Sequence, residues 1–212
     1  MIFRDKFSRI SEAFKMALGA LYVEEPAGIP VKGEIFMEMK DATTGEVLET
    51  RHIHNIITLD AGLLVAILCK DKSSRTNGIN MLAVGTGATG ALLSPDAPDN
   101  RQRKLNAEIE RKAFSSTTFR DASGNAVSYP TNVVDFTTTY GAAEAVGPLN
   151  EMALLSTISD NTAVKNPNPD TFPARTLTVD VTAYDIAINY LSFSVMTKPS
   201  TAVLTLTWRL SF

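Results

Sequence analysis

The sequence predicts a mainly β protein: an antiparallel β-sandwich, jelly-roll-like, with an N-terminal amphipathic helix and one short internal helix. Two observations carry this prediction. After residue 30, apolar and polar residues alternate with a period of two in many segments, as in half-buried strands. Regular helices do not separate these segments, which disfavours parallel α/β architectures. We therefore expect an N-terminal helix and linker over residues 1–30, followed by a β-sandwich domain over residues 31–212.

The composition indicates a packed domain and narrows the classes of function. Apolar residues make up 44% of the 212 residues, enough for a sizeable core. The formal net charge of −3 disfavours general nucleic-acid binding, which needs a clustered basic surface. The one cysteine, Cys69, excludes an intrachain disulfide, and the 2 histidines leave little material for acid–base or metal chemistry. We expect a protein that is not an enzyme and uses no cofactor.

The chain shows no targeting or membrane-spanning pattern. Charged residues interrupt the first 15 positions, so no apolar signal-peptide segment forms there. The longest apolar stretch, residues 59–69, is about half of the roughly 20 residues that a membrane span requires. We expect a soluble protein that is made in a cytoplasm and does not enter a membrane.

Residues 3–22 predict the N-terminal helix, because apolar side chains recur there at spacings of three and four. Pro26 and Pro30 end it. The apolar stripe packs either on the protein's own core or on another chain, and the linker that follows it favours the second alternative. The candidate docking residues are Phe3, Phe7, Ile10, Phe14, Leu18 and Leu21.

A β-hairpin is predicted next. Residues 31–40 and 46–57 alternate as strands, and the turn between them, 41–45, ends in Gly45, which tolerates positive φ. Thr58 then begins the short internal helix, with Asp60 in its first turn and its end near Lys70.

The remaining strands follow at turn signals rich in Gly, Pro, Asn and Asp. The final segment is the clearest, because its apolar residues, Trp208 among them, alternate without a break. The expected strands are 79–84, 105–119, 132–140, 149–158, 177–181, 187–196 and 201–212, and the long loops are 85–100 and 161–173.

Two local patterns resemble ligand sites. Residues 85–90 read G-x-G-x-x-G, but the Pro-containing segment that follows cannot form the helix that a dinucleotide site needs, so we interpret this stretch as a flexible loop. His52 and His54 lie two apart on a predicted strand, so both imidazoles could face one metal ion. Three copies could supply six nitrogens on a trimer axis, and Glu34 and Glu38 could approach from the paired strand. The alternative is a polar strand face without metal, which we favour.

The charged clusters indicate solvent-exposed surfaces. Glu108 and Glu110 stand beside Arg111 and Lys112 and predict a solvated strand face. Residues 101–104 form a short basic run, which we interpret as a solvated loop or an interface. Cys69 ends an apolar helix and is expected to be a buried small side chain.

Four segments, taken in order, resemble a group of tailed-bacteriophage virion proteins described as minor capsid, decoration, tail or fibre-associated. They are the strand-to-helix passage 54–68, the pair 81–87 and 105–111, the strand 149–155 and the closing strand 204–212. Residues 1–30 do not match this pattern. The third segment departs from it, since Ala153 stands where these proteins usually have Gly.

The resemblance implies a non-enzymatic β-sandwich in the virion that acts by self-association, as a trimer or hexamer, and by docking to other virion proteins. It implies no catalytic residues. A tail, baseplate or fibre-adaptor role is preferred, and capsid decoration is the alternative. A second alternative is glycan binding. Trp208, in the buried stripe, counts against it, and the remaining aromatic candidates are Tyr22, Tyr129, Tyr140 and Phe172.

Overall fold

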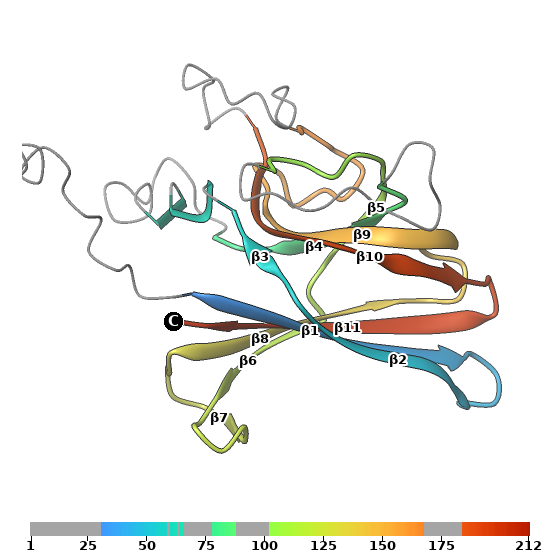
Figure 1. Ribbon diagram of the computed structural model, residues 1–212, viewed down its shortest axis with the longest axis horizontal. Coiled ribbons are helices and arrows are strands. Elements are labelled where there is room, and N and C mark those ends of the chain that lie inside the picture. The colour runs from blue at the N-terminus through green and yellow to red at the C-terminus, as the bar shows by residue number, and fades with distance from the viewer. Residues whose placement is uncertain (1–30, 59, 63, 66–77, 88–101, 168–183) are drawn as a thin grey trace, which may run out of the picture. The chain divides into compact units, whose positions relative to one another are not determined.

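The computed structural model describes residues 31–58, 60–62, 64–65, 78–87, 102–167 and 184–212. Residues Lys32–Ser211 form one compact unit. In the described part this unit is mainly β and consists of two antiparallel sheets, as predicted (Figure 1). The predicted N-terminal helix with its docking residues, the strand 177–181, and Cys69 lie outside the described residues.

Sheet A contains six strands in the order β2-β1-β11-β8-β6-β7. All neighbours are antiparallel. In chain order the strands are β1 (Lys32–Asp41), β2 (Val47–His54), β6 (Ser116–Arg120), β7 (Ala126–Val127), β8 (Val133–Tyr140) and β11 (Ala202–Ser211).

Sheet B contains five strands in the order β3-β10-β9-β4-β5, also antiparallel throughout. In chain order they are β3 (Ile56–Ile57), β4 (Met81–Gly85), β5 (Glu108–Ala113), β9 (Gly147–Ser156) and β10 (Ile186–Lys198). The predicted internal helix is seen in part, since residues 60–62 and 64–65 are helical.

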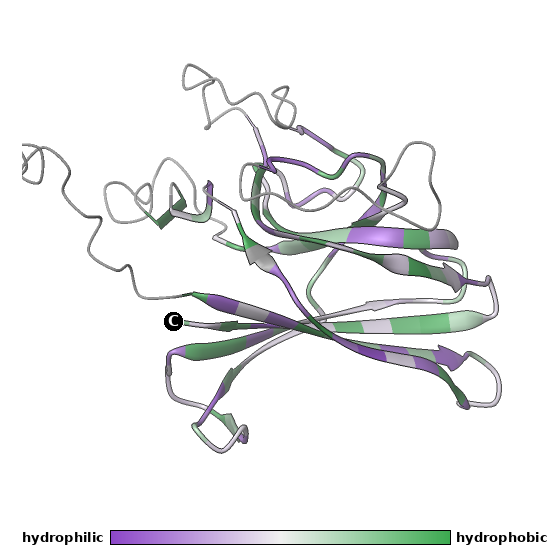
Figure 2. Cartoon of the chain, in the orientation of Figure 1, coloured by the Kyte–Doolittle hydropathy of each residue, from purple (hydrophilic) through white to green (hydrophobic). Residues whose placement is uncertain are grey.

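The alternation in the sequence places one face of sheet A in the core. Along β11 every second residue is buried, and β1 follows the same pattern. Figure 2 shows hydrophobic and hydrophilic residues alternating along these strands. One hydrophobic cluster joins side chains of both sheets; its members include Ile35, Met37, Leu82, Leu154, Leu191, Leu206 and Trp208.

Two predicted strands are each divided between the sheets, which corrects the prediction. The expected strand 46–57 breaks at Asn55 into β2 in sheet A and β3 in sheet B. The expected strand 105–119 breaks at residues 114–115 into β5 in sheet B and β6 in sheet A. At that second break the ring centroid of Phe114 lies 4.9 Å from that of Phe136, so the partly buried crossing residue packs against the core.

Asn55 fastens the crossing between β2 and β3. Its backbone N–H donates to the Gly33 carbonyl at 3.1 Å, and its side-chain Oδ1 accepts the Trp208 indole N–H at 3.3 Å. A Cβ on Gly33 would collide with the Asn55 amide, so glycine leaves the space that this side chain occupies. The buried indole therefore has its donor satisfied at the point where the chain changes sheets.

Tyr140 joins the two sheets by a hydrogen bond. The side chain is fully buried in β8, and its hydroxyl donates to the Leu82 carbonyl in β4 at 2.8 Å. Burial, followed by the charges of Glu110, Glu108 and Glu144, raises the pKa of Tyr140 well above its ordinary value of 10.0.

Replacing Tyr140 with Phe is expected to lower the free energy of unfolding by about 1 kcal/mol, because it removes one buried hydrogen bond. The raised pKa gives a pH signature. Protonated Tyr140 stabilises the fold below its ordinary pKa of 10.0, and this stability is lost as the pH rises towards the folded-state pKa. The difference between wild type and Tyr140→Phe should therefore shrink above pH 10, as measured by urea unfolding.

Tyr129→Phe is the matched control, since Tyr129 is 59% exposed. We expect its unfolding free energy to follow that of the wild type at every pH. A Tyr140→Phe protein as stable as the wild type at neutral pH would contradict the inter-sheet role.

Candidate functional site

The outer face of sheet A carries the histidines that the sequence singled out. His52 in β2 stacks on Phe36 in β1, with ring centroids 4.4 Å apart and an interplanar angle of 11°. Its Nε2 lies 3.1 Å from Glu34 Oε2. The His54 ring is 5.4 Å from the His52 ring and tilted by 51°. Strand alternation thus brings both histidines to one exposed face, as predicted.

Phe36 has neighbours on two sides. Its ring stacks with His52 on the β2 side, and the Arg209 guanidinium of β11 lies 5.2 Å from its centroid. Arg209 is held by the buried Asp135, at 2.7 and 3.0 Å, and this contact raises the pKa of Arg209. Arg120 binds the same carboxylate at 2.8 Å. Because these contacts occupy Phe36 from both neighbouring strands, its ring is poorly placed to stack on a sugar.

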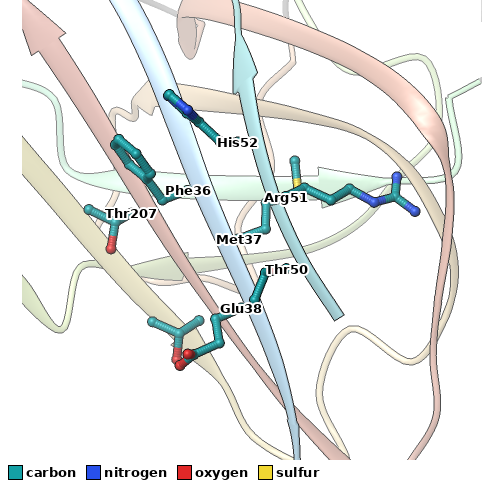
Figure 3. Close-up of a pocket in the computed structure, with 8 residues that line it drawn as sticks. Phe36, Met37, Glu38, Thr50, Arg51, His52 and Thr207 are labelled. Atoms are coloured by element: carbon teal, nitrogen blue, oxygen red, sulfur yellow. The ribbon is translucent and has the colours of Figure 1, made fainter. Parts of the chain in front are cut away.

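A shallow depression of about 430 Å³ lies beside this pair (Figure 3). Phe36, His52 and Thr207 lie on one side of the strands, and Arg51 extends away from them. The lining residues are Phe36, Met37, Glu38, Thr50, Arg51, His52, Thr205 and Thr207. The mixture of hydroxyl, imidazole and carboxylate groups on an open strand face suits contact with another surface better than enclosure of a small molecule.

The histidine pair does not form a complete metal site within the described part of the chain. No group of three or more His, Cys, Asp or Glu side chains that could hold an ion occurs among the described residues. Glu34 reaches His52, as expected, whereas Glu38 pairs with Lys40 at 2.6 Å. Metal binding by several copies of His52 and His54 stays the alternative to the polar strand face that we favour.

The second polar site is a carboxylate buried in sheet B. Glu151 lies in β9 and is fully inaccessible to solvent. Its Oε2 accepts the Asn106 N–H at 2.9 Å and the Tyr190 hydroxyl at 2.8 Å, and its Oε1 accepts the Ala107 N–H at 2.7 Å. Three donors offset the loss of hydration and hold the backbone at 106–107 against the sheet.

An ion network at β5 corrects the prediction that this strand has a solvated charged face. The side chain of Arg111 is 1% exposed, and it binds Glu108 at 2.6 Å and Asp185 at 2.6 Å. Burial alone lowers the pKa of Arg111, but the two carboxylates more than reverse this and raise it. Ile109, between these charges, is exposed, at 38%. The usual order of apolar inside and charged outside is therefore inverted here.

Asp185 extends the same network to the loop that precedes β10. Its carboxylate accepts the backbone N–H groups of Ile158 and Asn166, each at 3.1 Å, besides binding Arg111. A chain segment distant from β5 in sequence thus supplies the partner that allows Arg111 to be buried.

Within the basic run, Gln102 and Arg103 are buried, which corrects the solvated-loop interpretation and leaves the interface alternative untested. Arg103 is 5% exposed, and its Nε lies 2.8 Å from Asp60 Oδ2. Asp60 follows Thr58, whose hydroxyl donates to the Ala187 carbonyl at 2.6 Å. The ion pair therefore connects the predicted helix start to the segment before β5.

The glycines of the G-x-G-x-x-G pattern make room for backbone and for Glu151. A Cβ on Gly85 would lie 2.6 Å from Glu151 Oε1 and collide with the Ala107 carbonyl. Gly87 has φ of +50°, and a Cβ there would lie 2.9 Å from Asn150 Oδ1. Close packing thus explains Gly85 and Gly87. The expected flexible loop is contradicted at Gly85, which lies in β4, and residues 88–90 lie outside the described residues.

Sequence reasoning did not identify Glu151 and Asp185 as buried carboxylates that hold loop backbone in place. The signal for Glu151 was present, because a carboxylate in the middle of the otherwise apolar segment 149–155 must either face solvent or have buried donors. No comparable signal marked Asp185, whose partners lie far away in the sequence.

No protein-family model and no curated protein matches this chain. Among the described residues, no helix is long and apolar enough to cross a membrane.

Gly85→Ala is expected to lower the free energy of unfolding by about 1–3 kcal/mol, because the new methyl group would overpack the space occupied by Glu151 and Ala107. Thermal unfolding followed by circular dichroism measures it. Gly62→Ala is the matched control, since a Cβ there meets nothing within 4 Å. A Gly85→Ala protein as stable as Gly62→Ala would show that the close approach is unimportant.

Proposed function

We propose that the chain is a structural component of a tailed-phage virion: a homo-oligomeric tail, baseplate or fibre-adaptor protein. It has a β-sandwich body and acts by self-association and by docking to neighbouring virion proteins. It acts without bond-making chemistry.

The observation that carries the proposal is that the segments that resemble phage virion proteins contact one another within the domain. Asn55, from the first segment, accepts the indole N–H of Trp208, from the last. Glu151, from the third, holds the backbone of residues 106–107, from the second, beside Gly85. All of these contacts join segments of the domain body to one another, which fits a scaffold.

The outer face of sheet A supports a role in contact between surfaces. Its threonines form cross-strand pairs, Thr137 with Thr207 at 3.1 Å and Thr139 with Thr205 at 3.3 Å. Beside them lie His52 and Phe36. Such a broad polar face with aromatic and arginine side chains resembles protein–protein interfaces in composition.

Deleting residues 1–24 is expected to leave a folded β body and to abolish attachment to the docking partner, because the arm supplies the apolar stripe that includes Phe3, Phe7 and Phe14. Circular dichroism and thermal unfolding report the fold. Incorporation into particles in an infection complemented with the truncated chain reports attachment. A truncated chain that cannot fold would place the stripe in the protein's own core.

Immunogold labelling of intact particles, viewed by negative-stain electron microscopy, tests the position in the virion. We expect label at the tail or its tip. Label over the head would instead support the alternative, a capsid decoration protein. Absence of label from both intact and disrupted particles would overturn the virion proposal.

Glycan binding is the second candidate function, and the exposure of Tyr129 is the observation that favours it. Tyr129 is 59% exposed, whereas Tyr140 and Trp208 are buried; Tyr22 and Phe172 lie outside the described residues. On a glycan array, a glycan-binding protein would give signals that Tyr129→Ala removes and Tyr129→Phe retains. An array without signal would exclude this role.

A further inference from the structure

The edges of the two sheets differ in how well they are protected. An unprotected edge strand exposes unpaired backbone N–H and C=O groups to which another strand can add. In the described part of the chain the edge strands are β2 and β7 in sheet A and β3 and β5 in sheet B. β3 and β7 contain only two residues each, which limits pairing.

β5 is protected by charged side chains. It carries Glu108, Glu110, Arg111 and Lys112. Lys165 also donates to the carbonyl of Ile109 at 3.3 Å, which occupies a backbone acceptor of this strand. Another chain would have to displace this contact before it could pair along β5.

β2, with eight residues, is the long edge strand in sheet A. Its first two residues, Val47 and Leu48, are exposed apolar side chains, at 48% and 47%. The register against β1 shifts at Leu48, and from Glu49 to His54 the pairing is regular. This strand therefore offers a regular edge next to exposed apolar residues.

The register against β1 shows which backbone groups of β2 face outward. The Asn55 N–H donates to the Gly33 carbonyl, so Asn55 faces β1. In an antiparallel ladder the facing residues alternate, so Arg51 and Glu49 also bond towards β1. The N–H and C=O groups of Thr50 and His52 point to the open edge.

The charges of β2 select one way of pairing this edge with itself. When two copies pair antiparallel with Thr50 opposite Thr50, each Glu49 stands opposite Arg51 of the other copy, and the outward backbone groups of both strands meet. Shifting one β2 strand by two residues along the other would place Arg51 opposite Arg51, and the two like charges would repel each other. The next shift would place Arg51 opposite Ile53, where the charge has no partner.

The positions of Glu49 and Arg51 suit this arrangement. The two side chains already bind each other within the chain at 2.5 Å, and they are 32% and 18% exposed. Arg51 also donates to the Val195 carbonyl of β10 at 3.1 Å, which fixes its guanidinium near the edge. Facing residues that are not hydrogen-bonded have the closer side chains in antiparallel pairs, and Glu49 and Arg51 would be such a pair.

We propose that the β2 edge pairs antiparallel with β2 of a second copy of this chain, about a two-fold axis at Thr50. The pairing extends sheet A across the interface. This inference rests on the proposed function, because it names the surface through which the homo-oligomer forms. By itself a two-fold contact closes a dimer. Together with a separate three-fold contact it gives a dihedral hexamer, and a simple cyclic trimer contains no two-fold contact.

Sedimentation equilibrium of the full chain tests the proposal by a charge exchange. Glu49→Arg places like charges opposite each other twice per interface and should raise the dissociation constant about tenfold or more. Glu49→Arg/Arg51→Glu restores opposite charges and should return the dissociation constant towards that of the wild type. The matched control is Glu144→Arg, the same change of charge beside β5 of sheet B, where Glu144 pairs with Lys112 at 2.5 Å; it should leave association unchanged.

A backbone variant tests the same edge without changing a charge. Thr50→Pro removes an N–H that points away from β1, so the hydrogen bonds between β1 and β2 within each chain are kept. The two hydrogen bonds between Thr50 of one copy and Thr50 of the other are lost. Thr50→Val is its control, because valine keeps the N–H. We expect Thr50→Pro to dissociate and Thr50→Val to associate as the wild type does, with circular dichroism showing that both are folded.

The outcomes separate this proposal from the proposed function. A wild-type chain that associates while Glu49→Arg and Thr50→Pro retain its mass would overturn the β2 interface and leave self-association standing elsewhere. A folded double variant that stays dissociated would overturn the register at Thr50. A wild-type chain that is monomeric at every concentration would overturn both the interface and the homo-oligomer.

Discussion

The buried carboxylate of Glu151 is the interaction on which the arrangement around sheet B depends. A carboxylate without solvent must have donors, and here the donors are the backbone N–H groups of Asn106 and Ala107 and the Tyr190 hydroxyl. Meeting this requirement brings residues 106–107 onto the outer side of β9, opposite the shared core. Gly85 is required by the same constraint, because any side chain there would fill the space that the carboxylate and the Ala107 carbonyl occupy.

The two sheets consequently have different surroundings. β4 and β9 of sheet B are buried on both faces, and a second apolar cluster that includes Met81, Leu105 and Leu155 lies on the side away from the shared core. Sheet A buries one face and presents the other to solvent, as the alternating exposure of β11 shows. Surfaces for other molecules are therefore to be sought on sheet A, on its open face and along its β2 edge.

The buried ion pairs of this protein serve mainly to fix the positions of loops. Arg111 is enclosed with Glu108 and Asp185, and Arg103 with Asp60. The Arg111–Asp185 and Arg103–Asp60 pairs join segments that are far apart in the sequence, whereas Glu108 binds Arg111 from within β5. Such ion pairs determine the positions of the loops. Most of the stabilisation of the folded state comes from the apolar core between the sheets.

The sequence by itself determined where strands lie and which side chains they bury. Along β1 and β11 the period of two follows from the pleat of an extended chain, so alternation is sufficient to predict that Ile35 and Trp208 face the core. The turns were equally local. Asp41 accepts the N–H groups of Thr43 and Thr44, at 2.9 and 2.8 Å, and this lowers its pKa. The common face of His52 and His54 followed from the same alternation.

Only the tertiary structure decided which sheet each strand joins and which charges are buried. The breaks at Asn55 and Phe114 depend on Trp208 and Phe136, which lie far along the chain. Arg111 is buried because Asp185 reaches it from another segment, and no local pattern encodes that meeting. The alternation of apolar and polar residues shows which face of a strand is buried along its whole length. The partner of a single charged group is set by long-range contacts, which form only when the sheets come together.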